Sequence, residues 1–239
     1  MLIKRLPEQT INRIAAGEVI ERPASAAKEL VENSIDAGAS NIEITVRDGG
    51  KSMLAVVDNG VGMTLQDLEL AIERHATSKL PDNNLQAITT LGFRGEALPS
   101  IGAVSRFSLQ SRASQKHDAW MINVDGGIVN SPTPTSHSCG TTAVVRDLFY
   151  ATPARLKFLR TEKTESQRIV DAIKRIAMSH PEVGFRLTVD GRPRLRYTAE
   201  KGDLVSTRLA RLKAVMGAEF AENAAGVSVV KGIKSANER

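Results

Sequence analysis

The chain has 239 residues, of which 41% are hydrophobic and 25% are charged, a composition typical of a globular protein with a sizeable core. It excludes a disulfide-stapled peptide and a mainly disordered chain. The single cysteine, Cys139, excludes an internal disulfide and a cysteine-rich zinc site. No run of about 18 apolar residues occurs, so we expect a cytoplasmic protein with no membrane partner.

Charge is distributed unevenly along the chain. Residues 1–145 carry 13 basic and 16 acidic side chains, whereas residues 146–239 carry 19 basic and 11 acidic ones. The net charge is therefore −3 in the first part and +8 in the second. A basic region of this kind favours a polyanionic partner, although a solvated basic surface has the same composition.

Periodicity and turn residues predict a mixture of helices and strands. Residues 23–37 are expected to form a helix, because proline is typical of a helix start and Gly38 of a helix end. The strands 42–46 and 53–57 flank Asp48-Gly-Gly50, a hairpin signal, and a helix followed by a hairpin indicates an α+β fold. Further helices are expected at 65–75, 97–104, 162–180 and 206–216, strands at 106–112, 119–124, 141–146, 184–189, 194–197 and 227–233, and irregular segments at 76–96 and 130–138.

The first helix carries a polar face that is suited to a metal and a water molecule. Glu29, Asn33 and Asp36 are spaced i, i+4 and i+7, so they project to one side. An amide oxygen is a hard ligand suited to Mg²⁺, and a carboxylate one turn earlier can orient or deprotonate water. Glu32 is the rival base, but it points about 100° away around the helix. A solvated polar helix face is the alternative interpretation.

A second motif follows the strand at 53–57. Asp58 comes at the end of that strand, and Gly60 and Gly62 allow a ligand to approach the backbone. A carboxylate in this position can accept a hydrogen bond from an exocyclic amine, such as that of adenine. A simple Asp-Asn-Gly turn is the alternative.

A third motif precedes the helix at 97–104. Gly92 and Gly95 flank Arg94, and backbone N–H groups at a helix start bind anions such as phosphate. Upstream, Thr77, Ser78 and Lys79 offer hydroxyls and a cation. Residues 76–98 are therefore typical of a flexible lid that covers phosphates, with an ordinary surface loop as the alternative.

The order of these motifs resembles the N-terminal region of MutL-type DNA mismatch repair proteins, in the GHKL ATPase superfamily. The resemblance is carried by residues 14–23, 28–39, 58–62, 74–79, 92–97, 140–142 and 148–155. It implies a two-layer helix/sheet sandwich of the GHKL (Bergerat) type over residues 1–200. Residues 201–239 would then begin a truncated, transducer-like second α/β domain.

The resemblance also implies a role for individual residues. Glu29 would be the general base, Asn33 the Mg²⁺ ligand and Asp58 the partner of the adenine amine. Thr142 would support Asp58 from the sheet. The implied cofactor-binding residues are Asn33, Asp36, Ala37, Asp58, Gly60, Gly62, Met63, Thr77, Ser78, Lys79, Gly92, Phe93, Arg94, Gly95, Glu96, Ala97, Leu98 and Thr142.

The implied function is a slow, ATP-driven conformational switch in DNA mismatch repair. ATP with Mg²⁺ would close the lid and pair two copies through residues 1–20, coupling a mismatch-recognition protein to downstream repair enzymes. In the family a later domain supplies a lysine to the γ-phosphate, so this chain is expected to bind ATP but to hydrolyse it weakly.

Contact with DNA is a separate hypothesis. Arg155, Lys157, Arg160 and Lys163 form a basic cluster that would bind the DNA backbone without sequence preference. A solvated surface, or a patch that joins two domains, is the alternative for this cluster. For the whole chain, the alternative is a non-enzymatic DNA-binding or protein-interaction module with a vestigial nucleotide pocket.

Overall fold

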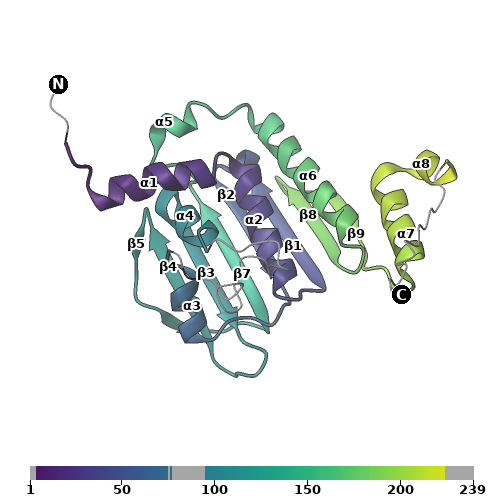
Figure 1. The fold of residues 1–239 in the computed structure, drawn as a ribbon, viewed down its shortest axis with the longest axis horizontal. Helices are drawn as coiled ribbons and strands as arrows, with labels where there is room; N and C mark the ends of the chain where they lie inside the picture. The colour runs from purple at the N-terminus through teal and green to yellow at the C-terminus, as the bar shows by residue number, and fades with distance from the viewer. Residues whose placement is uncertain (1–3, 75, 77–94, 224–239) are drawn as a thin grey trace, which may run out of the picture.

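The computed structural model describes residues 4–74, 76 and 95–223. Its strands form one mixed sheet in the order β5-β4-β3-β7-β2-β1-β8-β9, with β6 paired to β4. Helices α1, α2, α4 and α6 lie over one face of this sheet (Figure 1). The strands are β1 (Asn41–Arg47), β2 (Met53–Asp58), β3 (Arg106–Arg112), β4 (Ala119–Asp125), β5 (Ile128–Val129), β6 (Thr133–Thr135), β7 (Gly140–Arg146), β8 (Gly184–Val189) and β9 (Arg192–Tyr197). The expected α+β, two-layer fold is confirmed.

The predicted helices within the described residues are confirmed, with small differences at their ends. The helix expected at 65–75 ends at Ala71, and the one expected at 206–216 begins at Leu204. The helices are α1 (Glu8–Val19), α2 (Pro23–Asp36), α3 (Leu65–Ala71), α4 (Ala97–Val104), α5 (Pro153–Leu156), α6 (Glu162–Ser179), α7 (Leu204–Met216) and α8 (Ala218–Glu222), with a 3₁₀ turn, η1, at Asp48–Gly50. Across the ranges that the structure describes, no helix is both long and apolar enough to cross a membrane.

The hairpin of β1 and β2 is confirmed and forms the centre of the sheet. The two strands pair antiparallel, and η1 closes the turn with Gly49 and Gly50 at φ values of 67° and 85°. These left-handed conformations are readily adopted by glycine. The other edge of β1 pairs parallel with β8, about 140 residues later in the chain.

The core lies between the sheet and the helix layer, and α2 packs on its central strands. Ala26, Ala27 and Val31 on α2 are fully buried, as are Ile44 and Leu54 on the sheet face below. Small side chains let α2 approach the sheet closely. This approach brings the polar residues of α2 close to the end of β2.

Two parts of the chain differ from the sequence-based expectation. The helix α1 was not predicted: it follows Pro7 without a side-chain cap and is stabilised by Ala16 and Ile20, which are fully buried. The segment expected to be irregular at 130–138 contains a short strand, β6, because Thr133–Thr135 pairs with the edge of β4. The prediction was wrong for these three residues. The strand expected at 227–233 lies outside the described residues.

A buried arginine attaches α7 to the rest of the fold. Arg211 is fully buried, and its guanidinium donates hydrogen bonds to carbonyl oxygens beyond the end of α6 and on the loop after β9. Its five acceptors are the carbonyls of Ala177, His180, Pro181, Val183 and Thr198, at 2.7–3.0 Å. Burial lowers the pKa of Arg211, and the charges of Glu200 and Glu182 oppose this effect.

Candidate nucleotide site

Asp58, at the end of β2, is held by three hydrogen-bond donors. Its side chain is buried, with 8% exposed. Oδ2 accepts a hydrogen bond from the Ser34 hydroxyl at 2.8 Å, and Oδ1 accepts from the N–H groups of Gly60 at 2.9 Å and Thr141 at 3.3 Å. Burial raises the pKa of Asp58, and the hydrogen bonds from Gly60, Ser34 and Thr141 and the charge of His137 only partly offset it. The carboxylate is therefore fixed in position and poorly hydrated.

The expectation that Thr142 supports Asp58 from the sheet is wrong. The register pairs Thr142 with Val57 and Thr141 with Asp58. Directly paired residues share one face of an antiparallel sheet, and successive residues alternate between faces. The Thr142 hydroxyl accordingly lies on the face opposite Asp58, 2.8 Å from Nε2 of His137. Thr141 is the residue that contacts Asp58.

The glycines after Asp58 let the loop pack against the end of α2. A Cβ on Gly60 would lie 2.7 Å from the carbonyl oxygen of Ala37, and one on Gly62, at φ 68°, would overlap the carbonyl of Arg112. The N–H of Val61 donates to the Ala37 carbonyl at 2.9 Å. The structure thus brings Ala37 and Gly60 together next to Asp58, whereas Gly62 packs against Arg112 at the end of β3.

A hydroxyl from β3 orders the next residue of the loop. Ser111 is fully buried, accepts a hydrogen bond from the N–H of Met63 at 2.9 Å and donates to the carbonyl of Gly140 at 2.8 Å. Cys139 also lies against the loop, with Sγ 3.3 Å from the Gly60 carbonyl. Met63 is therefore placed at the site by strand residues that the sequence motif does not contain.

Glu29 lies on α2 beside a cation. The Lys28 ammonium is 3.3 Å from Oε1 of Glu29 and 2.6 Å from Oε2 of Glu32. Burial lowers the pKa of Lys28, but the hydrogen bond to Glu32 and the charge of Glu29 outweigh it, so the net shift is upward. Lys28 is thus held in its charged form between the expected base and its rival.

Asn33 and Asp36 follow Glu29 along α2, and both are partly buried. In the described ranges, no group of three or more His, Cys, Asp and Glu side chains is placed to hold a metal by itself. A single amide ligand fits Mg²⁺, which keeps several waters and binds phosphate oxygens. The donor set on α2 is therefore compatible with a nucleotide-borne Mg²⁺.

The start of α4 supplies the described part of the expected phosphate site. Gly95 has φ 61°, and a Cβ there would overlap the carbonyl of Ala76. Glu96 occupies the N-cap position of α4, and Ala97 and Leu98 begin the helix. The other residues expected in this part, Thr77, Ser78, Lys79, Gly92, Phe93 and Arg94, lie outside the described residues.

Sequence reasoning missed Ser34, Lys28 and Thr141. Ser34 had a detectable signal, because it follows Leu30 by one helical turn and so interrupts the apolar stripe of α2 with a hydroxyl. The role of Thr141 could be predicted only with the exact strand register. The role of Lys28 depends on the side-chain conformations of Glu29 and Glu32.

The basic cluster is only partly brought together. Lys157, Arg160 and Lys163 are exposed, between α5 and the first turn of α6. Arg155 is half-buried, and its guanidinium packs against Gly17 of α1. Arg155 is therefore engaged with the N-terminal helix.

A groove of about 760 Å³ lies between α1 and residues 151–159. Its lining includes Ile14, Gly17, Arg155 and Phe158. Ile14 is 53% exposed and Phe158 is 82% exposed. Large exposed apolar side chains gathered in one place are typical of an interaction surface.

The chain matches a known family of ATPases. Residues 20–139 match the family of histidine kinase-, DNA gyrase B-, and HSP90-like ATPases. This range includes α2, the Asp58 loop and the start of α4, and the chain belongs to this family.

Within the family the chain is of the MutL type. It is 57% identical to the DNA mismatch repair protein MutL of Rhodospirillum rubrum, over 95% of this chain and 36% of that protein. The MutL of Paramagnetospirillum magneticum is 53% identical, over 94% of this chain and 37% of that protein. The chain spans about a third of the length of these relatives.

Solved structures agree with this assignment. A structure described as the Aquifex aeolicus MutL ATPase domain complexed with ADP has a TM-score of 0.68 and 33% identity, covering 83% of this chain and 70% of that one. The N-terminal domain of a DNA repair protein has a TM-score of 0.71 and 31% identity, covering 87% and 60%.

Proposed function

We propose that this chain binds Mg-ATP beside Asp58 and serves as the ATP-driven switch of a DNA mismatch repair factor. The observation that carries the proposal is the buried Asp58 carboxylate, whose oxygens are oriented by Ser34, Gly60 and Thr141. A desolvated acceptor of this kind discriminates strongly in favour of a ligand that donates to it, because an unmatched polar group would be left unpaired. The adenine amine is such a donor, and Asp36, Ala37, Gly60, Gly62 and Met63 would surround the base.

The remaining residues serve the phosphates and water. Asn33 would hold Mg²⁺, which supplies neutralisation of phosphate charge. The N–H groups from Gly95 to Leu98 lie at the start of α4, where a helix favours anions. Glu29 would accept the proton of the attacking water. Oε1 of Glu29 lies 3.3 Å from the Lys28 ammonium, and we propose that hydrolysis is slow.

We also propose that nucleotide pairs two copies of the chain through residues 1–20. The groove between α1 and residues 151–159, with the exposed side chains of Ile14 and Phe158, supports this proposal. In the same proposal, residues 201–239 begin a second domain. Partners would include a mismatch-recognition protein, downstream repair enzymes and, through Lys157, Arg160 and Lys163, DNA; the location would be cytoplasmic.

Molecular mass with and without a non-hydrolysable ATP analogue and Mg²⁺ tests the switch. The wild type is expected to change from monomer to dimer, and Asp58→Ala is expected to stay monomeric and to lose nucleotide binding. Asp118→Ala, which removes an exposed carboxylate, is the matched control. Nucleotide binding that survives in Asp58→Ala would favour the alternative, a DNA-binding or protein-interaction module with a vestigial pocket.

A further inference from the structure

Arg74 joins the N-terminal helix to the start of α4. Its Nη2 donates to the carbonyl oxygen of Asn12, in α1, at 3.0 Å. Its Nη1 lies 3.4 Å from Oε2 of Glu96, at the N-cap of α4. The side chains of Arg74 and Glu96 are 24% and 18% exposed, so this contact is partly shielded from solvent. One guanidinium therefore contacts both the segment proposed to pair two copies and the segment proposed to hold phosphate.

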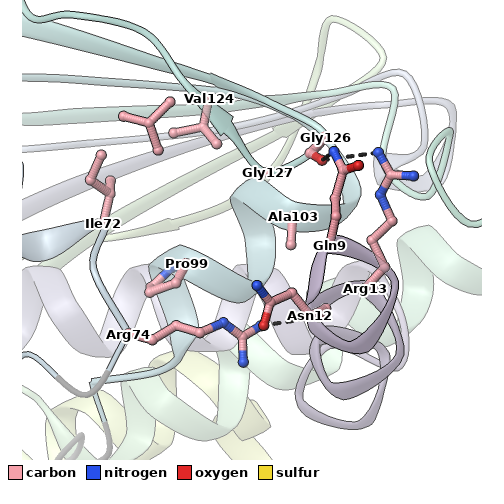
Figure 2. Close-up of a pocket in the computed structure, with 11 residues that line it drawn as sticks. Gln9, Asn12, Arg13, Ile72, Arg74, Pro99, Ala103, Val124, Gly126 and Gly127 are labelled. Carbon is pink, nitrogen blue, oxygen red and sulfur yellow. Dashed lines mark hydrogen bonds between the residues drawn. The ribbon is translucent and has the colours of Figure 1, made fainter. Parts of the chain in front are cut away.

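The two halves of α1 are held to the fold in different ways. In its last turn and just beyond it, Ala16 and Ile20 are fully buried. Its first half borders a cavity of about 380 Å³, whose lining includes Ile72, Pro99 and Val124 (Figure 2).

Hydrogen bonds join the first half of α1 to residues on the other sides of this cavity. Arg13 Nη2 donates to the carbonyl of Gly126 at 3.1 Å, and Gln9 donates to the same oxygen at 3.4 Å, while Arg74 donates to Asn12 from the other side (Figure 2). Ile11, in this half, and Ile14, which follows it directly, are half exposed. If this half of α1 shifts, the hydrogen bonds to Gly126 and from Arg74 change, while the buried Ala16 and Ile20 stay in place.

We infer that Arg74 is a positioning residue that couples nucleotide binding to the position of the N-terminal helix. The inference rests on the proposed nucleotide-dependent pairing. A phosphate at the start of α4 brings negative charge next to Glu96, which repels the carboxylate and attracts the guanidinium. Any movement of the guanidinium changes its hydrogen bond to the carbonyl of Asn12. The N-terminal helix thus responds to the nucleotide without touching it.

Coupling of this kind is reciprocal, so it can be measured from the nucleotide side. If nucleotide strengthens pairing by some factor, pairing strengthens nucleotide binding by the same factor. Affinity for the non-hydrolysable analogue is measured at a protein concentration where the chain is monomeric and at one where it pairs, and the ratio is the coupling factor. We expect roughly fivefold or more in the wild type.

Arg74→Lys is the informative variant. Lysine keeps the charge but has no planar fork, so it cannot serve Asn12 and Glu96 together. We expect the ratio to fall close to one. We also expect hydrogen exchange of α1 amides in residues 8–13 to become insensitive to the analogue. Arg186→Lys is the matched control, because Arg186 is also an arginine paired with a glutamate, Glu43, but it lies on β8 of the sheet; it should keep the wild-type ratio.

A wild-type ratio in Arg74→Lys would overturn the inference. Equal loss of the ratio in Arg74→Lys and Arg186→Lys would also overturn it, because that result indicates a general effect of replacing an ion-paired arginine. If the wild type binds the analogue and pairs, the proposed function stands whatever the Arg74 variants show. If the wild type does neither, the proposed function fails first and the inference fails with it.

Discussion

The hydroxyl of Ser34 donates to Oδ2 of Asp58 across 2.8 Å, and this hydrogen bond joins the helix layer to the sheet at the candidate site. Ser34 is carried by α2, which also carries Glu29 and Asn33. Asp58 is carried by β2. The contact therefore sets the position of the residues proposed for water and Mg²⁺ relative to the residue proposed for adenine.

Ser34→Ala should weaken nucleotide binding by roughly tenfold, because a hydrogen bond to a charged group contributes ~1.5 kcal/mol. Calorimetric titration with the non-hydrolysable analogue measures the change. Ser100→Ala is the control: Ser100 is a buried serine of α4 whose hydroxyl makes no hydrogen bond within the described part of the chain. Unchanged affinity in Ser34→Ala would show that Asp58 does not need this donor.

Asp58→Asn should stabilise the nucleotide-free protein at neutral pH. Burial raises the pKa of Asp58 above 3.8, so its stability contribution is fully present below the unfolded-state pKa and is lost as the pH rises through the folded-state pKa. Asparagine avoids this loss. The melting temperature of the variant relative to wild type should therefore be higher at neutral pH than in acid.

Asp118→Asn provides a control of opposite sign. The hydrogen bond from the Trp120 indole lowers the pKa of the exposed Asp118. Its contribution to stability is thus present above the unfolded-state pKa and lost as the pH falls through the lower folded-state pKa. The variant should be less stable than wild type at neutral pH. The same pH trend in both variants would contradict the assignment for Asp58.

Gly62→Ala should destabilise the protein by about 3 kcal/mol or more, because a Cβ there meets the Arg112 carbonyl as well as a positive φ. Gly191→Ala is matched in conformation, at φ 74°, but a Cβ there has no atom of the described residues within 4 Å. It should cost about 1 kcal/mol. Thermal unfolding of both variants separates the close contact from the backbone strain, and equal losses would contradict the packing argument.

Glu29→Gln should retain nucleotide binding and lose turnover by about 100-fold or more, the usual contribution of a general base. Turnover is measured at high protein concentration. Glu32→Gln is the natural control, because Glu32 lies on the same helix and contacts the same Lys28 ammonium, at 2.6 Å. If Glu32→Gln were the variant that lost turnover, the roles of the two glutamates would be exchanged.

Reversal of charge at Lys157, Arg160 and Lys163 should weaken DNA binding and its dependence on salt. Each neutralised phosphate contributes about 0.9 to the log–log slope, so the slope should fall by roughly 2–3 if all three side chains contact the backbone. Arg192 and Arg194, on β9, provide an equally exposed control pair. Binding that shows no change in slope would favour the solvated-surface interpretation.

Local signals were strong enough to predict much of this fold. Helix α2 begins at Pro23 and ends just before Gly38, as expected, and the Asp48-Gly-Gly50 turn closes the β1–β2 hairpin. These features depend on residues adjacent in the chain, whose conformational preferences act over a few bonds. In contrast, α1 has no side-chain cap and depends on burial of Ala16 and Ile20.

The amino-acid sequence by itself determined the class of site: an acidic strand end with glycines, a helix bearing Glu29 and Asn33, and a glycine-rich start of α4. Only the tertiary structure decided which side chains complete it. A shift of one residue in strand register reverses the face of every side chain, which is why Thr141, not Thr142, supports Asp58. The contacts of Ser34 with Asp58, and of Arg74 with Asn12, likewise join segments distant in the chain, so packing had to place them.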